Sequence, residues 1–219
     1  MKIFPVYLNR LSEEKTVLVG GNHEAERKAK ELLECDARPT VISPHLTEDL
    51  KRLVDDDKVD WIDRSYREGD LEGAFLVIVA EYEDDENHRI FKEAEKLGIL
   101  VNVMDDIPHC NFTFGSLVKR GPLTLSISTS GAAPALAVRL RERFEAEFGS
   151  EYEQFLQFSR VLRKPMAQVY SSFEERKKKW YELVDSDIIE LFRSDQKDQA
   201  YKRAAEIVGA EIVQKALNR

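Results

Sequence analysis

Five short apolar runs alternate with helix-like segments over the first 103 residues of this chain. The runs occupy residues 16–19, 39–42, 59–62, 74–80 and 99–103. The fourth run, AFLVIVA, has no polar side chain, which is typical of a central parallel strand that is buried on both faces. Between the runs, apolar residues recur with helical spacing, as they do over 24–34. This alternation predicts an α/β fold in which helices cover both faces of a parallel sheet.

The pattern changes in the second half of the chain. Residues 123–128, LTLSIS, alternate apolar and polar side chains after a Gly-Pro pair, which predicts a strand with one covered face. A helix is expected from Pro134 to Gly149, because apolar residues repeat there every four positions. Beyond Glu151 no strand pattern remains, and the apolar residues predict a small helical unit whose last helix covers 204–217. We therefore expect three sections.

A formal charge of −8, from 33 basic and 41 acidic side chains, narrows the classes of function. The acidic balance argues against a nonspecific nucleic-acid binder, which needs a basic face for the phosphates. No apolar run is long enough to cross a bilayer, and the first residues do not resemble a secretory signal. Cys35 and Cys110 lack the spacing of a metal site or of a disulfide framework. We expect a cytoplasmic protein with no membrane contact and no bound metal ion.

A glycine turn between the first strand and the first helix is the strongest local signal. Its sequence, GGNHEA at 20–25, puts small residues and a helix N-terminus where Rossmann folds bind a dinucleotide pyrophosphate. Asn22 stands where that pattern has its middle glycine, and its side chain crowds the path of the phosphates. The acid that grips a ribose after the second strand is also absent, since Ser43 stands there. A tight turn of any α/β protein explains the same residues equally well.

Two adjacent carboxylates follow the fifth strand. Asp105 and Asp106 stand at the sheet edge where parallel sheets bind ligands, so one of them would suit a general base. A loop acid that caps a turn or faces water is the simpler alternative. His23 and His109 are the two histidines nearest to candidate sites, and both are interpreted as isolated surface residues.

A loop of small residues leads into the helix at Pro134. Its sequence, STSGAAP at 128–134, offers hydroxyl and backbone N–H groups to an anion, or simply lets a strand pack closely on a helix. Lys119 and Arg120 lie near this loop and suit either a polycarboxylate ligand or a solvated surface.

Three long segments carry a resemblance to a known family. They are FPVYLNRLSEEKTVLVGGNHEAERKAKELLE, LEGAFLVIVAEYEDDENHRIFKEAEKLGILVNVMDD and HCNFTFGSLVKRGPLTLSISTSGAAPALAVRLRERFE. The most specific part is RGPLTLSISTSGAAPALA followed by RLRER, in its order after NVMDD. From about Phe4 to Phe148, the chain resembles the N-terminal family of sirohaem synthases. These are NAD-dependent precorrin-2 dehydrogenases, some of which are also sirohydrochlorin ferrochelatases.

The resemblance implies a layout and a reaction. It implies an NAD-binding Rossmann domain over 1–113, a dimerisation and substrate region over 114–149, and a C-terminal helical domain over 150–219. The protein would be a homodimer that transfers a hydride from precorrin-2, a tetrapyrrole with eight carboxylates, to NAD⁺. The product is sirohydrochlorin, and Fe²⁺ would be the substrate of a further insertion step.

The resemblance also assigns roles to residues. Asp105 would be the base in the oxidation, or take up pyrrole protons during metal insertion. The predicted substrate-binding residues are Ser128, Thr129, Ser130, Gly131, Lys119 and Arg120. The predicted cofactor-binding residues are Gly20, Gly21, Asn22, His23, Glu24, Ser43, Pro44, Ala80, Glu81 and Asn102.

The chain departs from the family pattern at three places. Asn22 replaces a glycine of the turn, Glu81 replaces a threonine after the fourth strand, and Ala133 replaces a helix-capping serine. These changes bear on cofactor affinity more than on the fold. Two alternatives therefore stay open: a metal chelatase with weakened NAD use, and a tetrapyrrole carrier or regulator without catalysis. The choice between NAD and NADP also stays open.

Overall fold

The computed structural model describes residues 2–80 and 83–218. The chain divides into two compact units, one formed by Phe4–Phe114 and the other by Gly115–Arg219 with Met1–Ile3. Each unit is described by itself. The division into three domains that the resemblance implies stays a prediction.

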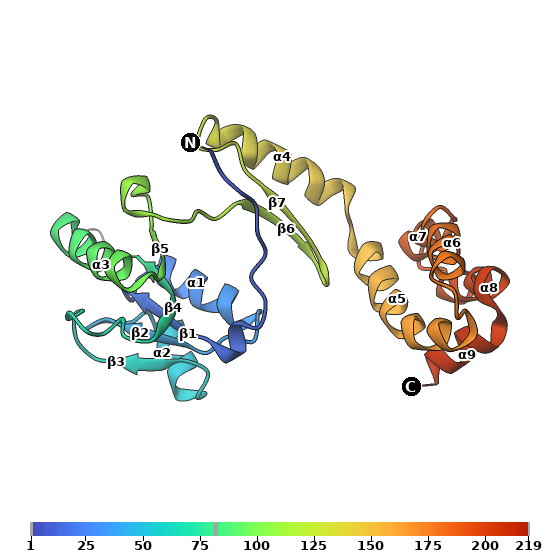
Figure 1. The fold of residues 1–219 in the computed structure, drawn as a ribbon, viewed down its shortest axis with the longest axis horizontal. Coiled ribbons are helices and arrows are strands. Elements are labelled where there is room, and N and C mark those ends of the chain that lie inside the picture. Colours follow the sequence, from blue (N-terminus) through green and yellow to red (C-terminus); the bar gives the residue numbers. More distant parts are fainter. Residues whose placement is uncertain (1, 81–82, 219) are drawn as a thin grey trace. The chain divides into compact units, whose positions relative to one another are not determined.

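The first unit contains a parallel sheet of five strands, as the alternation of apolar runs predicts. The strands are β1 (Lys15–Val19), β2 (Pro39–Ile42), β3 (Asp60–Ile62), β4 (Ala74–Val79) and β5 (Leu100–Val103). They lie in the order β3-β2-β1-β4-β5, and each neighbouring pair is parallel (Figure 1). The order reverses between β1 and β4, which is the switch point where sheets of this kind bind ligands.

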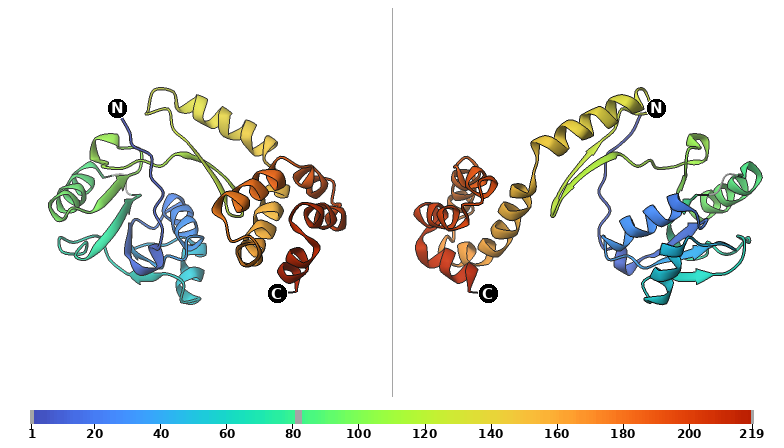
Figure 2. Two further views of the ribbon diagram at one scale, coloured as in Figure 1. Left: turned by 45° about the vertical axis from the view of Figure 1, so that its right-hand side comes forward. Right: turned by 180° about the vertical axis from the view of Figure 1, so that it is seen from behind.

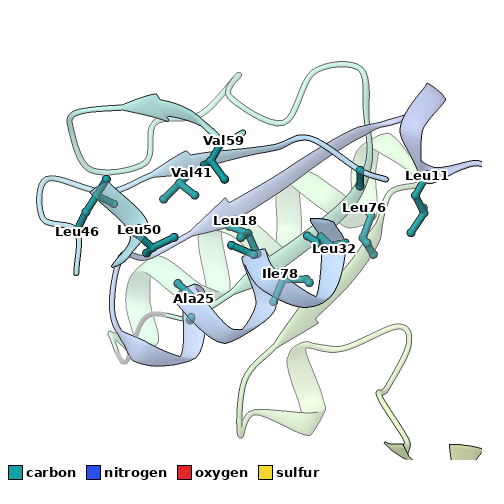
Figure 3. Close-up of a cluster of buried hydrophobic side chains, with 13 residues drawn as sticks. Leu11, Leu18, Ala25, Leu32, Val41, Leu46, Leu50, Val59, Leu76 and Ile78 are labelled. Atoms are coloured by element: carbon teal, nitrogen blue, oxygen red, sulfur yellow. The ribbon is translucent and has the colours of Figure 1, made fainter. Parts of the chain in front are cut away.

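Helices cover both faces of this sheet because successive side chains of each strand point to opposite faces. Leu18 and Ile78 pack with Ala25, on the face covered by α1 (His23–Leu33) and α2 (Glu48–Asp55) (Figure 3). Val17 and Val79 point the other way, toward α3 (Asp84–Leu97). Two short 3₁₀ helices, η1 (Leu11–Glu13) and η2 (Ile107–His109), complete the unit. The parallel α/β architecture is confirmed.

The second unit begins with an antiparallel hairpin. Its strands are β6 (Ser116–Arg120) and β7 (Leu123–Ile127), which join at Gly121 and pack with α4 (Pro134–Glu147). The sequence pattern predicts β7 but not β6. The segment SLVKR has one deeply buried residue, Val118, and this is too little alternation to identify a strand. Pairing with β7 makes it one.

Helices form the rest of the second unit. They are α5 (Ser150–Val169), α6 (Phe173–Val184), α7 (Ile188–Arg193), α8 (Lys197–Val208) and α9 (Ala210–Leu217) (Figure 2). Buried apolar side chains from all five helices form one core. The expected single helix over 204–217 is wrong. Gly209 separates α8 from α9 with a φ of 100°, which no helix can contain. In the described part of the chain, no helix combines the length and the apolar character needed to span a membrane.

Candidate functional site

The glycine turn after β1 lies at the switch point of the sheet. Gly20 has a φ of 112°, a backbone conformation that side-chain-bearing residues rarely adopt, and its N–H donates to the Ile42 carbonyl at 2.9 Å. A Cβ on Gly21 would collide with the backbone carbonyl of His45. The Gly21 carbonyl also accepts the N–H of Thr47 at 3.0 Å. Glycine is therefore favoured at both positions, at Gly20 by the positive φ and at Gly21 because the loop after β2 lies directly against the turn.

Asn22 closes the start of α1 with its own side chain. Its Oδ1 accepts the backbone N–H groups of Glu24 and Ala25, each at 3.0 Å. Its Nδ2 donates to the carbonyl of Ala80, just after β4, at 2.6 Å. One amide thus caps the helix and links it to the neighbouring strand across the switch point.

The N–H groups at the start of α1 determine whether the turn suits a dinucleotide phosphate. Two N–H groups converge on one oxygen at a helix N-terminus, which is the donor arrangement that binds phosphate oxygens. That oxygen now belongs to Asn22, so a phosphate would fit after the amide turns away. Glu24 adds a negative charge beside the turn, although Arg27 pairs with it. The His23 ring is 93% exposed. The residues therefore fit a phosphate, but its binding displaces existing hydrogen bonds.

Most of the other predicted cofactor residues on this edge form hydrogen bonds within the protein. The buried Ser43 hydroxyl donates to the His45 carbonyl at 2.7 Å, so it shapes the loop after β2. The exposed Pro44 lies in that loop, and the N–H of Ala80 bonds the Val19 carbonyl at 2.8 Å. Asn102 donates inward to the Phe112 carbonyl at 3.0 Å. Glu81 lies outside the described residues.

Asp105 lies at the rim of a pocket on the same sheet edge. Its φ is 60°, a left-handed conformation that aspartate tolerates better than most residues, and its side chain is exposed. The pocket has a volume of about 410 Å³, and its lining residues are Asp84, Asn87, Met104, Asp105, Asp106, Pro108 and His109. Three of these side chains are carboxylates, so the pocket attracts protons and cations.

His109 is not isolated, contrary to the interpretation from sequence. Its Nδ1 lies 2.7 Å from Asp106 Oδ2, and its Nε2 lies 3.0 Å from His88 Nδ1. The ring also meets Phe91 edge-on, with 5.2 Å between centroids. The spacing of Asp106 and His109 is a signal that the sequence does contain, but His88 comes from α3 and joins them only through the fold.

Cys110, next to His109, has an inert environment. Its thiol donates to the Val103 carbonyl at 3.2 Å and accepts the Val103 N–H at 3.3 Å. Burial raises the pKa of the Cys110 thiol, which keeps it protonated. Over residues 2–80 and 83–218, no three His, Cys, Asp or Glu side chains are grouped so that they could hold a metal ion.

The loop between β7 and α4 carries the predicted substrate residues. The exposed Ser128 accepts the Ser130 N–H at 3.1 Å, and Thr129 Oγ1 accepts the Ala133 N–H at 3.2 Å. Ser130 and Gly131 both have positive φ, at 54° and 79°. Thr129 therefore fixes the backbone of Ala133 just before α4, but the N-cap position of this helix has no side-chain cap.

The two predicted basic residues lie at the end of β6. Arg120 donates to the Lys119 carbonyl and to the Glu145 carbonyl, both at 2.8 Å. Its guanidinium thus fastens the hairpin to the C-terminal part of α4. Lys119 pairs with Thr124 in the hairpin ladder. These residues and the loop 128–131 belong to the second unit, whereas Asp105 and the glycine turn belong to the first.

Two family models match consecutive parts of the chain. The model described as "Putative NAD(P)-binding" matches residues 8–116, and the model described as "Sirohaem biosynthesis protein central" matches residues 120–147. The first match contains the glycine turn and Asp105, and the second contains the loop before α4.

Curated relatives extend the match over most of the chain. Siroheme synthase from Photorhabdus laumondii is 34% identical over 203 residues, which are 93% of this chain and 43% of that protein. Siroheme synthase 1 from Aeromonas salmonicida is 35% identical over 187 residues, or 85% of this chain and 40% of that protein. The chain thus spans less than half the length of these relatives.

A solved structure shares the fold. The structure of SirC, precorrin-2 dehydrogenase, superposes with a TM-score of 0.76 and covers 99% of this chain and 100% of that one. The two sequences are 23% identical. At that identity, the likeness extends to the arrangement of strands and helices.

Proposed function

We propose that this chain, which belongs to the N-terminal sirohaem synthase family, oxidises precorrin-2 to sirohydrochlorin with a nicotinamide cofactor. One observation carries the proposal: a glycine turn and an acidic pocket lie at the same edge of the sheet, at the ends of β1 and β5, with β4 between these strands. Gly20 follows β1, Ala80 follows β4 and Asp105 follows β5, which is the order of these strands in the sheet. Such an edge holds a cofactor and a general base on one side of the sheet.

The glycine turn would hold the cofactor by its phosphates. The N–H groups of Glu24 and Ala25 are the donors, and Gly20 and Gly21 keep the backbone close. A nicotinamide cofactor held there would supply the hydride acceptor for the oxidation. We propose NAD rather than NADP, because the loop that begins at Ser43, SPHLT, contains no arginine to pair with a 2′-phosphate.

Asp105 would take the proton that leaves the macrocycle. Oxidation of precorrin-2 removes a hydride and a proton, so the enzyme needs one acceptor for each. A carboxylate at the rim of an open pocket reaches a bound ring without being buried itself, and it returns the proton to water afterwards. Asp106 suits this role less well, because it is hydrogen-bonded to His109.

The loop before α4 would hold the substrate. Eight carboxylates on precorrin-2 need hydrogen-bond donors, and the exposed Ser128 hydroxyl and the Gly131 backbone can supply them. Lys119 would add charge. We assign Arg120 an indirect part, because its guanidinium already bonds two carbonyls and fixes the hairpin on α4.

The proposal also covers assembly, location and division of the chain. We propose a homodimer in the cytoplasm, with the three domains bounded at 113 and 149 that the family resemblance implies. The absence of a disulfide framework agrees with a reducing compartment, since both cysteines are free thiols.

A second candidate function is favoured by Asn22. Because its amide occupies the phosphate position at α1, the chain would use nucleotide weakly and act mainly in inserting Fe²⁺ into sirohydrochlorin. In that case Asp105 would take up the pyrrole protons that the metal displaces. A carrier that binds the tetrapyrrole without changing it is the remaining alternative.

One anaerobic experiment separates these functions. The protein is incubated with precorrin-2, with and without NAD⁺, and then given Fe²⁺ or Co²⁺ while visible spectra are recorded. The proposal expects sirohydrochlorin only when NAD⁺ is present. If sirohydrochlorin is supplied directly and the protein accelerates metal insertion over the protein-free rate, the chelatase is supported. If the tetrapyrrole binds but its spectrum shows no conversion in any reaction, the carrier is supported, and both the dehydrogenase and the chelatase functions are contradicted.

A further inference from the structure

We infer that the side chain of Asn22 is an internal competitor of the dinucleotide, which must displace it before a phosphate can bind at α1. The inference rests on the proposed use of a nicotinamide cofactor and adds the residue that sets its affinity. Asn22 is therefore a residue that controls cofactor binding, and it takes no part in the chemistry.

The contacts of Asn22 differ from those of an ordinary helix cap. A capping side chain usually accepts N–H groups of its own helix, and Asn22 Oδ1 does so with Glu24 and Ala25 at 3.0 Å. Asn22 Nδ2 also donates at 2.6 Å to the carbonyl of Ala80, 58 residues away on the next strand. The amide thus holds the two sides of the switch point together.

The cap of α2 provides the comparison. Thr47 Oγ1 accepts the Leu50 N–H at 3.2 Å, a contact within its own helix. Thr47 begins α2 at the same sheet edge as Asn22 begins α1, because both helices follow parallel strands. Its hydroxyl also bonds the Glu26 carboxylate on α1, so Thr47→Gly removes a cap and this contact but leaves the two N–H groups at the start of α1 bonded to Asn22.

Exchange of the amide for a phosphate oxygen is incomplete. The phosphate restores the two hydrogen bonds at α1, but as an acceptor it cannot restore the bond from Asn22 Nδ2 to Ala80. Nucleotide binding to wild type therefore breaks three hydrogen bonds of Asn22 and restores two, a net loss of one bond that does not arise with glycine at this position. Removal of one such bond corresponds to about tenfold in affinity.

Charge at the same turn offers a rival explanation. Glu24 lies in the first turn of α1, and its carboxylate repels a phosphate. Arg27 and Lys30 pair with Glu24 and Glu26, which offsets this repulsion. If charge sets the affinity, Glu24→Gln tightens nucleotide binding and Asn22→Gly leaves it unchanged.

Calorimetric titration with NAD⁺ of the full chain tests the inference on four proteins: wild type, Asn22→Gly, Glu24→Gln and Thr47→Gly. We expect Asn22→Gly to bind about tenfold tighter while its thermal midpoint falls, because glycine opens the turn and removes the cap. Thr47→Gly should lose stability without any gain in affinity. Wild type that binds as tightly as Asn22→Gly, or tightening by Glu24→Gln alone, overturns the inference and leaves nucleotide use intact.

Failure of the proposed function has a different signature. If neither wild type nor Asn22→Gly binds NAD⁺ or NADP⁺ while both stay folded, nucleotide use is contradicted and the inference with it. A second measurement does not depend on the variant folding. The side-chain amide signal of Asn22 in wild type should move and lose protection from hydrogen exchange as NAD⁺ saturates the protein, and an unchanged signal at saturation overturns the inference.

Discussion

Two loops of small residues lead into helices in this protein, and the helices that follow them differ in side-chain capping. At α1 the capping side chain, Asn22, belongs to the loop itself and fills the position where two N–H groups converge. At α4 the N-cap residue, Ala133, contributes no side-chain cap, and Thr129 Oγ1 accepts only the N–H of Ala133 itself, before the helix begins. The first helix, α1, therefore begins with a side-chain cap from its loop, whereas α4 begins without one.

Charge strengthens the contrast. The first turn of α1 contains Glu24 and Glu26, and the first turn of α4 contains no acidic residue. A helix N-terminus carries a partial positive charge, which acidic side chains offset and neutral ones leave available. The loop before α4 therefore suits a polycarboxylate better than the glycine turn suits a pyrophosphate. Similar sequence patterns can thus differ in their readiness to bind an anion.

Replacing Asp105 should have the largest effect on turnover. It separates a loss of chemistry from a loss of nucleotide binding. Asp105→Asn is expected to cut turnover by about a hundredfold or more, the scale of a lost general base. Affinity for NAD⁺ should stay unchanged, because Asp105 is not part of the glycine turn. Sirohydrochlorin formation followed by absorbance, with NAD⁺ titration by calorimetry, measures both.

Asp36→Asn is the matched control for Asp105. Asp36 is also an exposed aspartate with positive φ, at 59°, and it lies before β2 rather than after β5. Its replacement should leave turnover within a factor of about two. Equal losses in the two variants, or full activity of Asp105→Asn, would contradict the role of Asp105.

The glycines of the two loops should differ in their tolerance of a methyl group. In Gly21→Ala the new Cβ would collide with the His45 carbonyl, which is backbone and cannot move aside cheaply. We expect a loss of about 2 kcal/mol or more in the free energy of unfolding, measured by urea denaturation. A loss below about 0.5 kcal/mol would show that the loop after β2 does not lie against the turn as described.

Gly131→Ala tests the second loop and should cost less. No atom lies within 4 Å of a Cβ at this position, so the cost is only the strain of a φ of 79°. That strain corresponds to about 1 kcal/mol in the free energy of unfolding. If Gly131→Ala proves more damaging than Gly21→Ala in the same denaturation series, the contrast between the loops is wrong.

A pH effect in the second unit should be smaller still. Burial alone raises the pKa of Glu151, but hydrogen bonds from its own N–H, Arg193 and the Gly149 N–H outweigh burial and lower that pKa below 4.5. Because the folded pKa is depressed, the stabilisation is complete above pH 4.5 and is lost as the pH falls through the folded value. Unfolding of wild type and Glu151→Gln should therefore differ most near neutral pH and converge in acid.

Much of the first unit could be predicted from sequence because four of its strands, β1, β2, β4 and β5, are mostly buried on both faces. Apolar runs such as 74–80 need no knowledge of their partners to be identified. The hairpin was harder, since β6 becomes a strand by pairing with β7. Gly209 was missed as a break because a glycine in an apolar repeat reveals its φ only in the folded chain.

In the candidate site, too, some features follow from local sequence and others depend on contacts between distant elements. The positions of Gly20, Gly21 and Asp105 at the sheet edge follow from the order of strands and turns. The bond from Asn22 to Ala80 and the contact of His109 with His88 join residues from different elements, and no local pattern contains them. The sequence thus predicts that these residues lie at one edge of the sheet, and the fold determines which of their side chains are already hydrogen-bonded.

The ratio of NADH formed to sirohydrochlorin formed, in one anaerobic reaction with precorrin-2, tests the account most directly. Hydride transfer to the nucleotide predicts one NADH for each sirohydrochlorin, from the first turnovers onward. Sirohydrochlorin that accumulates with no NADH, or with no dependence on NAD⁺, would contradict it.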